Sequence, residues 1–158
     1  MVTLGNRWDS SAVGTSLYDA VGGMPALVAL AHSWHERCLA DPVVSHAFSH
    51  GFHPDHTNRL AAYWAEALGG PADYSATVQD QSAVVRMHSG NGPHEEMDRR
   101  ALAAFVAAMD DAGLPDDEGL RTTLADYFGW AIDDLNHAYP QGDDVPEGLP
   151  LPRWPLTD

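Results

Sequence analysis

The sequence predicts an all-α fold, and three observations carry that prediction. Apolar residues recur every three or four positions in several long segments, which is the period of an amphipathic helix. No segment alternates apolar and polar residues over the length of a strand. Glycine and proline gather between the periodic segments, as at Gly69-Gly70-Pro71 and residues 90–93, where they end helices. We therefore expect three or four longer helices and several short ones.

The expected helices follow one another with short breaks. Seven segments carry the helical pattern: residues 17–21, 25–40, 43–48, 55–68, 82–87, 97–108 and 120–135. Gly22-Gly23 ends the first segment, and Pro25 suits the first turn of the next. Residues 1–14 are polar and predict a loose arm, residues 15–139 one domain, and residues 140–158 an extended proline-rich tail. Within that tail, Trp154 is expected to fold back onto the domain.

Composition narrows the class of protein. With 158 residues, 44% of them hydrophobic, the chain is long enough for one compact domain with a sizeable core. It lacks a membrane-length apolar run and a secretory signal pattern, and Cys38 is its only cysteine, so we expect a soluble cytoplasmic protein. The net charge of −15 argues against nucleic acid and anionic membranes as partners. The basic residues are all arginines, and Arg59 and Arg86 lie nearest the candidate site described next.

Nine histidines are the main chemical signal. His88 ends a short apolar segment just before a glycine-rich break, where an imidazole nitrogen can point into a cavity as the fifth ligand of a haem iron. His35 and His56 share helix faces with core residues, so each is either a hydrogen-bonded core histidine or faces a ligand. One proximal and two distal candidates make a haem site the first hypothesis. Aromatic residues at helical spacing, such as Phe48 and Tyr63, suit either a core or the walls of a flat cofactor site.

Other chemistries have weaker support. A di-iron bundle needs Glu-x-x-His pairs and a helical zinc protease site needs His-Glu-x-x-His, and the sequence has neither. A mononuclear metal site from His53, His56 and one distant residue stays open. No Gly-x-Ser-x-Gly elbow is present, and Cys38 falls in mid-helix without a neighbouring base, which argues against nucleophilic catalysis.

Several short motifs in order resemble the truncated haemoglobins, the small two-over-two helical globins, and most closely group II. They are Leu17-Tyr18-Asp19-Ala20-Val21-Gly22-Gly23, Ala40-Asp41-Pro42-Val43, Gly69-Gly70-Pro71 with Tyr74-Ser75, and Arg86-Met87-His88. Each motif is weak alone, but the order and spacing are specific. The resemblance covers about residues 17–139 and implies a globin-like two-over-two helical sandwich around a haem.

The resemblance also assigns residues to the site. His88 falls at the position of the proximal iron ligand, which makes it the metal-binding residue. His35 falls where the family usually has a distal tyrosine, and His56 falls at the distal position of the next long helix. Further residues fall beside the haem or near its propionates: Phe48, Leu60, Tyr63, Tyr74, Arg86 and, as a nearby cation, Arg59. The family's group II tryptophan is absent, because Ala101 or Leu102 stands at its position.

The resemblance implies a protein that holds haem b and binds small ligands at its iron. The resemblance implies binding of dioxygen and other diatomic gases, with His56 or His35 as catalytic or hydrogen-bonding distal groups. Peroxidase-like or nitric oxide-consuming chemistry, fed by an electron-donating reductase, is the redox role that it implies. A second reading has one distal histidine on the iron, giving a six-coordinate resting state. A haem-free globin-fold sensor or interaction module and a non-haem metal-binding bundle are the alternatives, and the sequence leaves the oligomeric state open.

Overall fold

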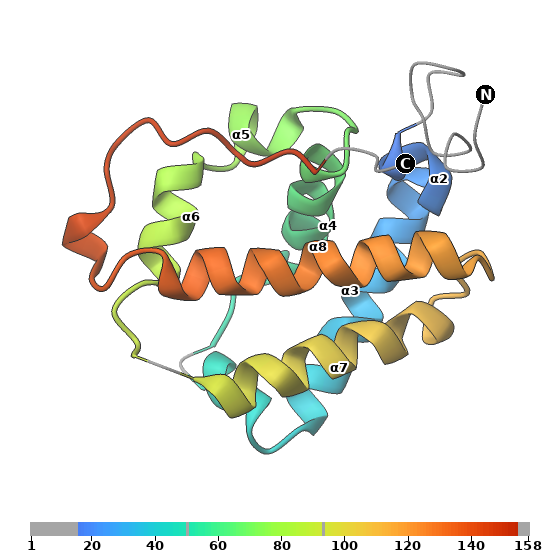
Figure 1. The fold of residues 1–158 in the computed structure, drawn as a ribbon, viewed down its shortest axis with the longest axis horizontal. Helices are drawn as coiled ribbons and strands as arrows, with labels where there is room; N and C mark the ends of the chain where they lie inside the picture. Colours follow the sequence, from blue (N-terminus) through green and yellow to red (C-terminus); the bar gives the residue numbers. More distant parts are fainter. Residues whose placement is uncertain (1–15, 50, 93, 155–158) are drawn as a thin grey trace.

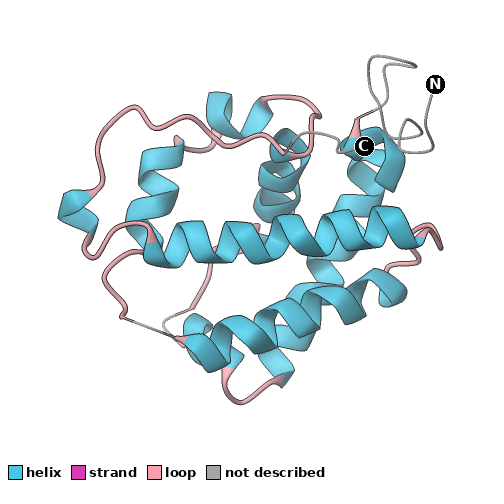
Figure 2. Ribbon diagram, viewed as in Figure 1, coloured by secondary structure: helices cyan, strands magenta, loops and turns pink. Residues whose placement is uncertain are grey.

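The computed structural model describes residues 16–49, 51–92 and 94–154. These residues form only helices and connecting loops (Figure 2), as the all-α prediction requires. The helices are α2 (Leu17–Val21), α3 (Gly23–Ala40), η2 (Val44–Phe48), α4 (His56–Ala67), α5 (Asp73–Thr77), α6 (Gln81–His88), α7 (Glu95–Asp111), α8 (Glu118–His137) and η3 (Gly142–Asp144). The predicted N-terminal arm, residues 1–14, lies outside the described residues, and the predicted domain boundaries stay predictions.

Helix α5 is one element that the periodicity did not predict. It has five residues, and only Tyr74 among them is buried, so it carries no apolar stripe. Its position depends on Glu66 of α4, whose buried carboxylate accepts hydrogen bonds from the backbone N–H of Ser75 at 2.9 Å and from the Ser75 hydroxyl at 2.6 Å. A contact between two elements therefore fixes this turn, and a local sequence pattern does not reveal it.

The long helices pack as two layers. Helix α3 packs against α4 and α7, while α7 and α8 lie side by side and run in opposite directions (Figure 1). Aromatic rings from all four helices meet between the layers: the rings of Phe105 and Phe128 stack at 4.2 Å, and Trp34 meets Phe128 edge-on at 5.6 Å. Among the described residues, no helix is both long enough and apolar enough to cross a membrane.

The Gly69-Gly70 pair allows the end of α4 to approach α2 closely. The backbone N–H of Tyr18 donates to the carbonyl oxygen of Leu68 at 2.9 Å. A Cβ atom on Gly70 would lie 2.6 Å from the Tyr18 ring and 2.8 Å from the carbonyl oxygen of Ala65. Only glycine fits at such a distance, which explains one of the motifs that carried the family resemblance.

The C-terminal segment follows the surface of the helices. After η3 it passes over α6 and α5, and its last described residue, Trp154, lies beside the end of α4 (Figure 1). The backbone N–H of Trp154 donates to the carbonyl oxygen of Ala67 at 2.8 Å, and its ring contacts Tyr127 and Trp130 at 5.7 and 5.3 Å. Trp154 thus folds back onto the helices, as the sequence predicts.

Candidate functional site: a cluster of histidines between α3, α4 and α6

His88 is the last residue of α6, and its orientation is fixed by its own helix. The Nδ1–H of His88 donates to the carbonyl oxygen of Val84 at 2.8 Å. Because that proton occupies Nδ1, the neutral ring keeps the lone pair of Nε2 free for a metal. Burial lowers the pKa of His88, which favours this neutral form. The helix then ends at Ser89 in extended conformation, and Gly90 and Gly92 follow with positive φ angles.

His35 and His56 lie together on the opposite side of the site, with buried nitrogens that have no partner. His35 is only 6% exposed, and its ring centre lies 4.8 Å from that of His56. Among the described residues, neither nitrogen of His35 and not Nε2 of His56 has a hydrogen-bond partner. Each buried polar atom left in this way costs about 1–3 kcal/mol. A ligand that contacts these nitrogens would remove that cost.

Electrostatics distinguish the two distal histidines. Burial first, and then the charges of His35, His53 and His88, lower the pKa of His56 to about 4. The pKa of His35 is lowered by burial and by His32, and Glu36 opposes the shift. The charge of His88 contributes to the pKa shift of His56 and not to that of His35, which indicates that His56 is the nearer of the two to the candidate proximal ligand.

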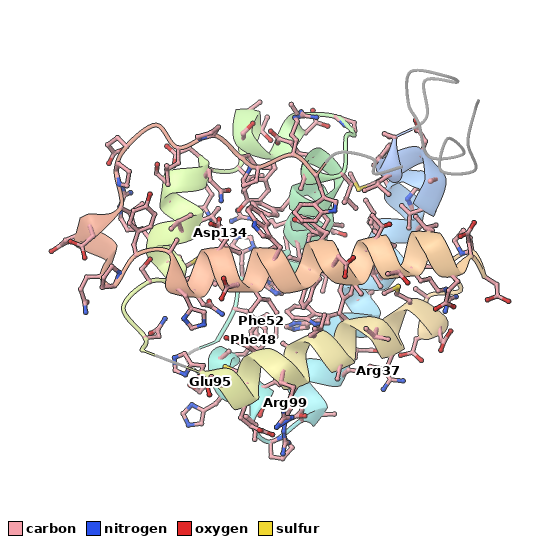
Figure 3. The ribbon with its side chains drawn as sticks, viewed as in Figure 1. Arg37, Phe48, Phe52, Glu95, Arg99 and Asp134 are labelled. Carbon is pink, nitrogen blue, oxygen red and sulfur yellow. The ribbon has the colours of Figure 1, made fainter. Side chains whose placement is uncertain are left out.

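Aromatic rings cover the distal histidines. The rings of Phe48 and Phe52 (Figure 3) meet His35 edge-on at 4.9 and 4.5 Å, and the same two rings lie 5.5 and 5.8 Å from His56. Phe48 thus lies beside both distal candidates, and its predicted contact with a haem stays a prediction. Phe52 was not predicted, because the loop after η2 has no periodic pattern that would place its side chain. Phe52 is 49% exposed and its ring contacts both histidines, so it covers them on a side that faces solvent.

A second group of predicted residues lies where α4 meets α5 and α6. The hydroxyl of Tyr63 donates to Oε1 of Gln81 at 2.8 Å, and its ring meets that of Tyr74 at 5.1 Å. Burial raises the pKa of Tyr74, and the nearby charge of Arg59 opposes the rise. Arg59 is exposed and has no ion-pair partner among the described residues. Arg59 is thus a cation beside Tyr74 without an ion-pair partner, so it is available to bind an anionic group.

Arg86 lies apart from these residues, on the side of α6 that faces the C-terminal segment. Its guanidinium donates to the Glu147 carboxylate at 2.8 Å and to the carbonyl oxygen of Val145 at 3.4 Å. Leu60 packs partly buried against the core. Two surface hollows lie outside the histidine cluster: one of about 350 Å³ is lined in part by Gly90 and His137, and one of about 290 Å³ lies between α7 and α8.

The residues present fit a haem. Nε2 of His88 could bind the haem iron, and the buried nitrogens of His35 and His56 could contact a ligand of that iron. The aromatic and aliphatic neighbours suit the apolar faces of a haem, and Arg59 suits its carboxylates. A metal ion alone fits less well, because no group of three His, Cys, Asp or Glu side chains in the described part of the chain is placed to hold one.

Comparisons with known proteins agree with this geometry. The family model of the bacterial-like globins matches residues 16–132. A haemoglobin from Thermobifida fusca is 27% identical, with a TM-score of 0.66 over 78% of this chain and 98% of that one. A group II truncated haemoglobin from Bacillus anthracis has the same fold at a TM-score of 0.66, over 77% of this chain and 90% of that one, with 16% identity.

A further relative is also a truncated haemoglobin, but its match covers less of this chain. The group 1 truncated haemoglobin GlbN of Nostoc commune is 28% identical over 68 residues, which are 43% of this chain. The match spans 58% of the length of that relative. The family match over residues 16–132 and the shared fold confirm what the short motifs predicted. The chain belongs to the bacterial-like globins, a family of truncated haemoglobins. Membership of this family implies haem-based binding of small ligands.

Proposed function

We propose that this chain holds haem b through His88 and binds dioxygen and other diatomic ligands on the side of His56 and His35. The observation that carries the proposal is the set of three buried imidazole nitrogens without partners, opposite a histidine whose Nε2 is free. When bound, the haem iron supplies a coordination position at which a small gas can bind. Everything else in the site comes from the protein.

His56 supplies the distal hydrogen bond. Its pKa of about 4 keeps the ring neutral at neutral pH, so it offers one N–H donor and one acceptor nitrogen. A ligand that gains negative charge on binding is stabilised by such a donor, whereas carbon monoxide gains less. His35 contacts the His56 ring, with 4.8 Å between the ring centres. Arg59, beside Tyr74, is the cation that would pair with a haem propionate.

Redox chemistry is the second part of the proposal. Peroxidase-like or nitric oxide-consuming reactions need an electron donor, which we propose is a separate reductase. With a pKa of about 4, His56 carries the extra proton of a general acid only under acidic conditions. Any help that His56 gives to peroxide cleavage should therefore increase as the pH falls toward 4.

The test is an absorption spectrum of the purified protein after haem reconstitution, ferric and then reduced, with and without carbon monoxide. We expect a Soret band that shifts on reduction and again with carbon monoxide. A low-spin ferric form that becomes high-spin in His56→Leu, but not in His35→Leu, would place His56 on the iron. A high-spin form in all three proteins would leave the sixth position open.

The same experiment separates the alternatives. A protein that takes up no porphyrin would be a haem-free member of the globin fold, with a sensing or interaction role. Stoichiometric iron or zinc without a porphyrin spectrum would indicate a metal-binding bundle. Either result would overturn the proposed function.

A further inference from the structure

The helix that carries His88 is held in place by the C-terminal segment. Helix α6 has eight residues and packs mainly on α8 and on η3 in the described part of the chain. The outer side of α6 is covered by residues 145–154, which lie beyond the region that the family model matches (Figure 1). We call residues 141–154 the C-terminal strap. The family match, residues 16–132, does not include the strap, so the role of the strap follows from its own contacts.

Ser82, in the first turn of α6, is the centre of this contact. The Ser82 side chain is fully buried, and its hydroxyl donates to the carbonyl oxygen of Pro146 at 2.7 Å. The same oxygen accepts a hydrogen bond from the backbone N–H of Leu149 at 3.0 Å. One buried hydroxyl thus satisfies a backbone acceptor and a backbone donor of the strap, and both would lose their partner if the hydroxyl were removed.

A second contact joins the strap to the other end of α6, close to His88. Arg86 donates to the Glu147 carboxylate at 2.8 Å and to the carbonyl oxygen of Val145, whose side chain is itself buried. A Cβ atom on Gly142 would lie 3.2 Å from Cγ of Arg86, so the strap backbone lies directly against this side chain. Both ends of the helix are therefore attached to the same segment.

The far end of the strap reaches the C-terminal end of α4, the helix that begins at His56. The backbone N–H of Trp154 donates to the carbonyl oxygen of Ala67, the last residue of α4. His56 is the first residue of the same helix. The strap therefore connects the helix of the proximal candidate to the helix of the distal candidate. His88 cannot turn independently of α6, because its Nδ1–H is bonded to the Val84 carbonyl within that helix.

We propose that the C-terminal strap positions His88 by clamping α6, with Ser82 and Glu147 as the positioning residues. The strap limits how far α6 can tilt or move away from α8, and so limits the positions that Nε2 of His88 can take. The role of the strap in ligand chemistry rests on the proposed function, since it acts through His88. The clamp itself is a property of the polypeptide and can be measured without haem.

Two variants of the full chain test the clamp, and one control matches the charge change of the second. Ser82→Ala removes both hydrogen bonds at the buried hydroxyl. Glu147→Gln removes a carboxylate that is 83% exposed and cannot disturb the core. Asp143→Asn is the control, since it removes one negative charge from an exposed residue of the same strap.

The first readout is hydrogen exchange of backbone amides in the haem-free protein. We expect amides of α6 and of residues 145–149 to exchange together, at least tenfold faster in Ser82→Ala and about two- to threefold faster in Glu147→Gln. Amides of α3 and α7 should be unchanged, as should all amides in Asp143→Asn. Exchange in α6 that matches the parent in both variants would overturn the clamp, whether or not the protein binds haem.

The second readout is the bond between His88 and iron in the reconstituted protein. The iron–imidazole stretching band in the resonance Raman spectrum should shift or broaden in Ser82→Ala, and haem transfer to excess apomyoglobin should be several-fold faster. A merely structural loss of stability would not move this band in a sample that is still folded. Faster α6 exchange with an unchanged band and unchanged haem transfer would overturn the positioning role, while failure of the parent to bind haem would overturn the proposed function alone.

Discussion

On the α6 side of the site, the Nδ1–H of His88 is bonded to the Val84 carbonyl, and the helix is attached to the C-terminal strap at both ends. On the α3–α4 side, His35 and His56 contact each other, yet three of their nitrogens have no partner among the described residues. The proximal histidine is thus oriented by a hydrogen bond within its own helix, whereas the distal histidines have buried nitrogens that the described chain does not satisfy. This difference indicates that the proximal side is built to hold one group in place, and the distal side to receive one that the chain does not supply.

The largest effect should come from removing the proximal imidazole. His88→Gly should weaken haem retention at least a hundredfold, about 2.8 kcal/mol, because no second histidine of α6 can replace it. Added imidazole should restore part of the Soret band by occupying the space that the ring leaves. The exposed His46→Gly is the control and should bind as the parent does. Equal haem retention in both variants would place the iron ligand elsewhere.

The distal side should make stability depend on pH. The pKa of His56 is about 4 in the folded protein and 6.5 in a free histidine, so between these values the unfolded chain binds a proton that the folded chain does not. The free energy of unfolding should therefore rise with pH across this window and fall by about 2 kcal/mol for His56 alone between pH 7 and pH 5.

Urea unfolding of the haem-free protein at the two pH values measures this change. The burial of His35 and His88 lowers their pKa values too, so the parent should lose more stability than His56 alone accounts for. His56→Gln should lose about 2 kcal/mol less than the parent over the same interval. An identical pH dependence in the two proteins would show that His56 is not buried in the way described.

Replacing the inner distal histidine should stabilise the haem-free protein. His35→Leu removes two buried nitrogens without partners and keeps a side chain of similar size, so the free energy of unfolding should rise by about 1–2 kcal/mol. His88→Leu should show no such gain, because its Nδ1–H already has a partner. Thermal unfolding of the two variants and the parent measures the contrast. A loss of stability in His35→Leu would mean that its nitrogens are satisfied in solution.

The sequence predicted the helices well because their signals are local. Apolar spacing and Gly–Pro breaks placed the long helices, and the break after α6 identified His88. Sequence patterns could not place the side chains whose positions depend on contacts between distant parts of the chain. Arg86 was predicted near the cofactor, and that prediction is untested, but its contact with Glu147, 61 positions further along the chain, follows from no local pattern. Likewise, the contact between the rings of His35 and His56 depends on how α3 and α4 pack, which periodicity does not specify.

The smallest effect on haem release should come from removing the charge of Arg59. This variant would decide which of the two arginines that the sequence singled out, Arg59 or Arg86, pairs with a haem propionate. Arg59 is free beside Tyr74, whereas Arg86 is bonded to the strap, so only Arg59 is available to a propionate without breaking another contact. Arg59→Gln should release haem to excess apomyoglobin about two- to fivefold faster, a change below about 1 kcal/mol, as expected for an exposed ion pair. The difference should shrink at high salt, because an exposed pair is screened. The exposed Arg153→Gln carries the same charge change next to Trp154, which is bonded to the opposite end of α4 from Arg59, and should release haem at the parent rate. If Arg59→Gln also behaves like the parent, the propionates meet no arginine of α4, and Arg86 would have to leave Glu147 when haem binds.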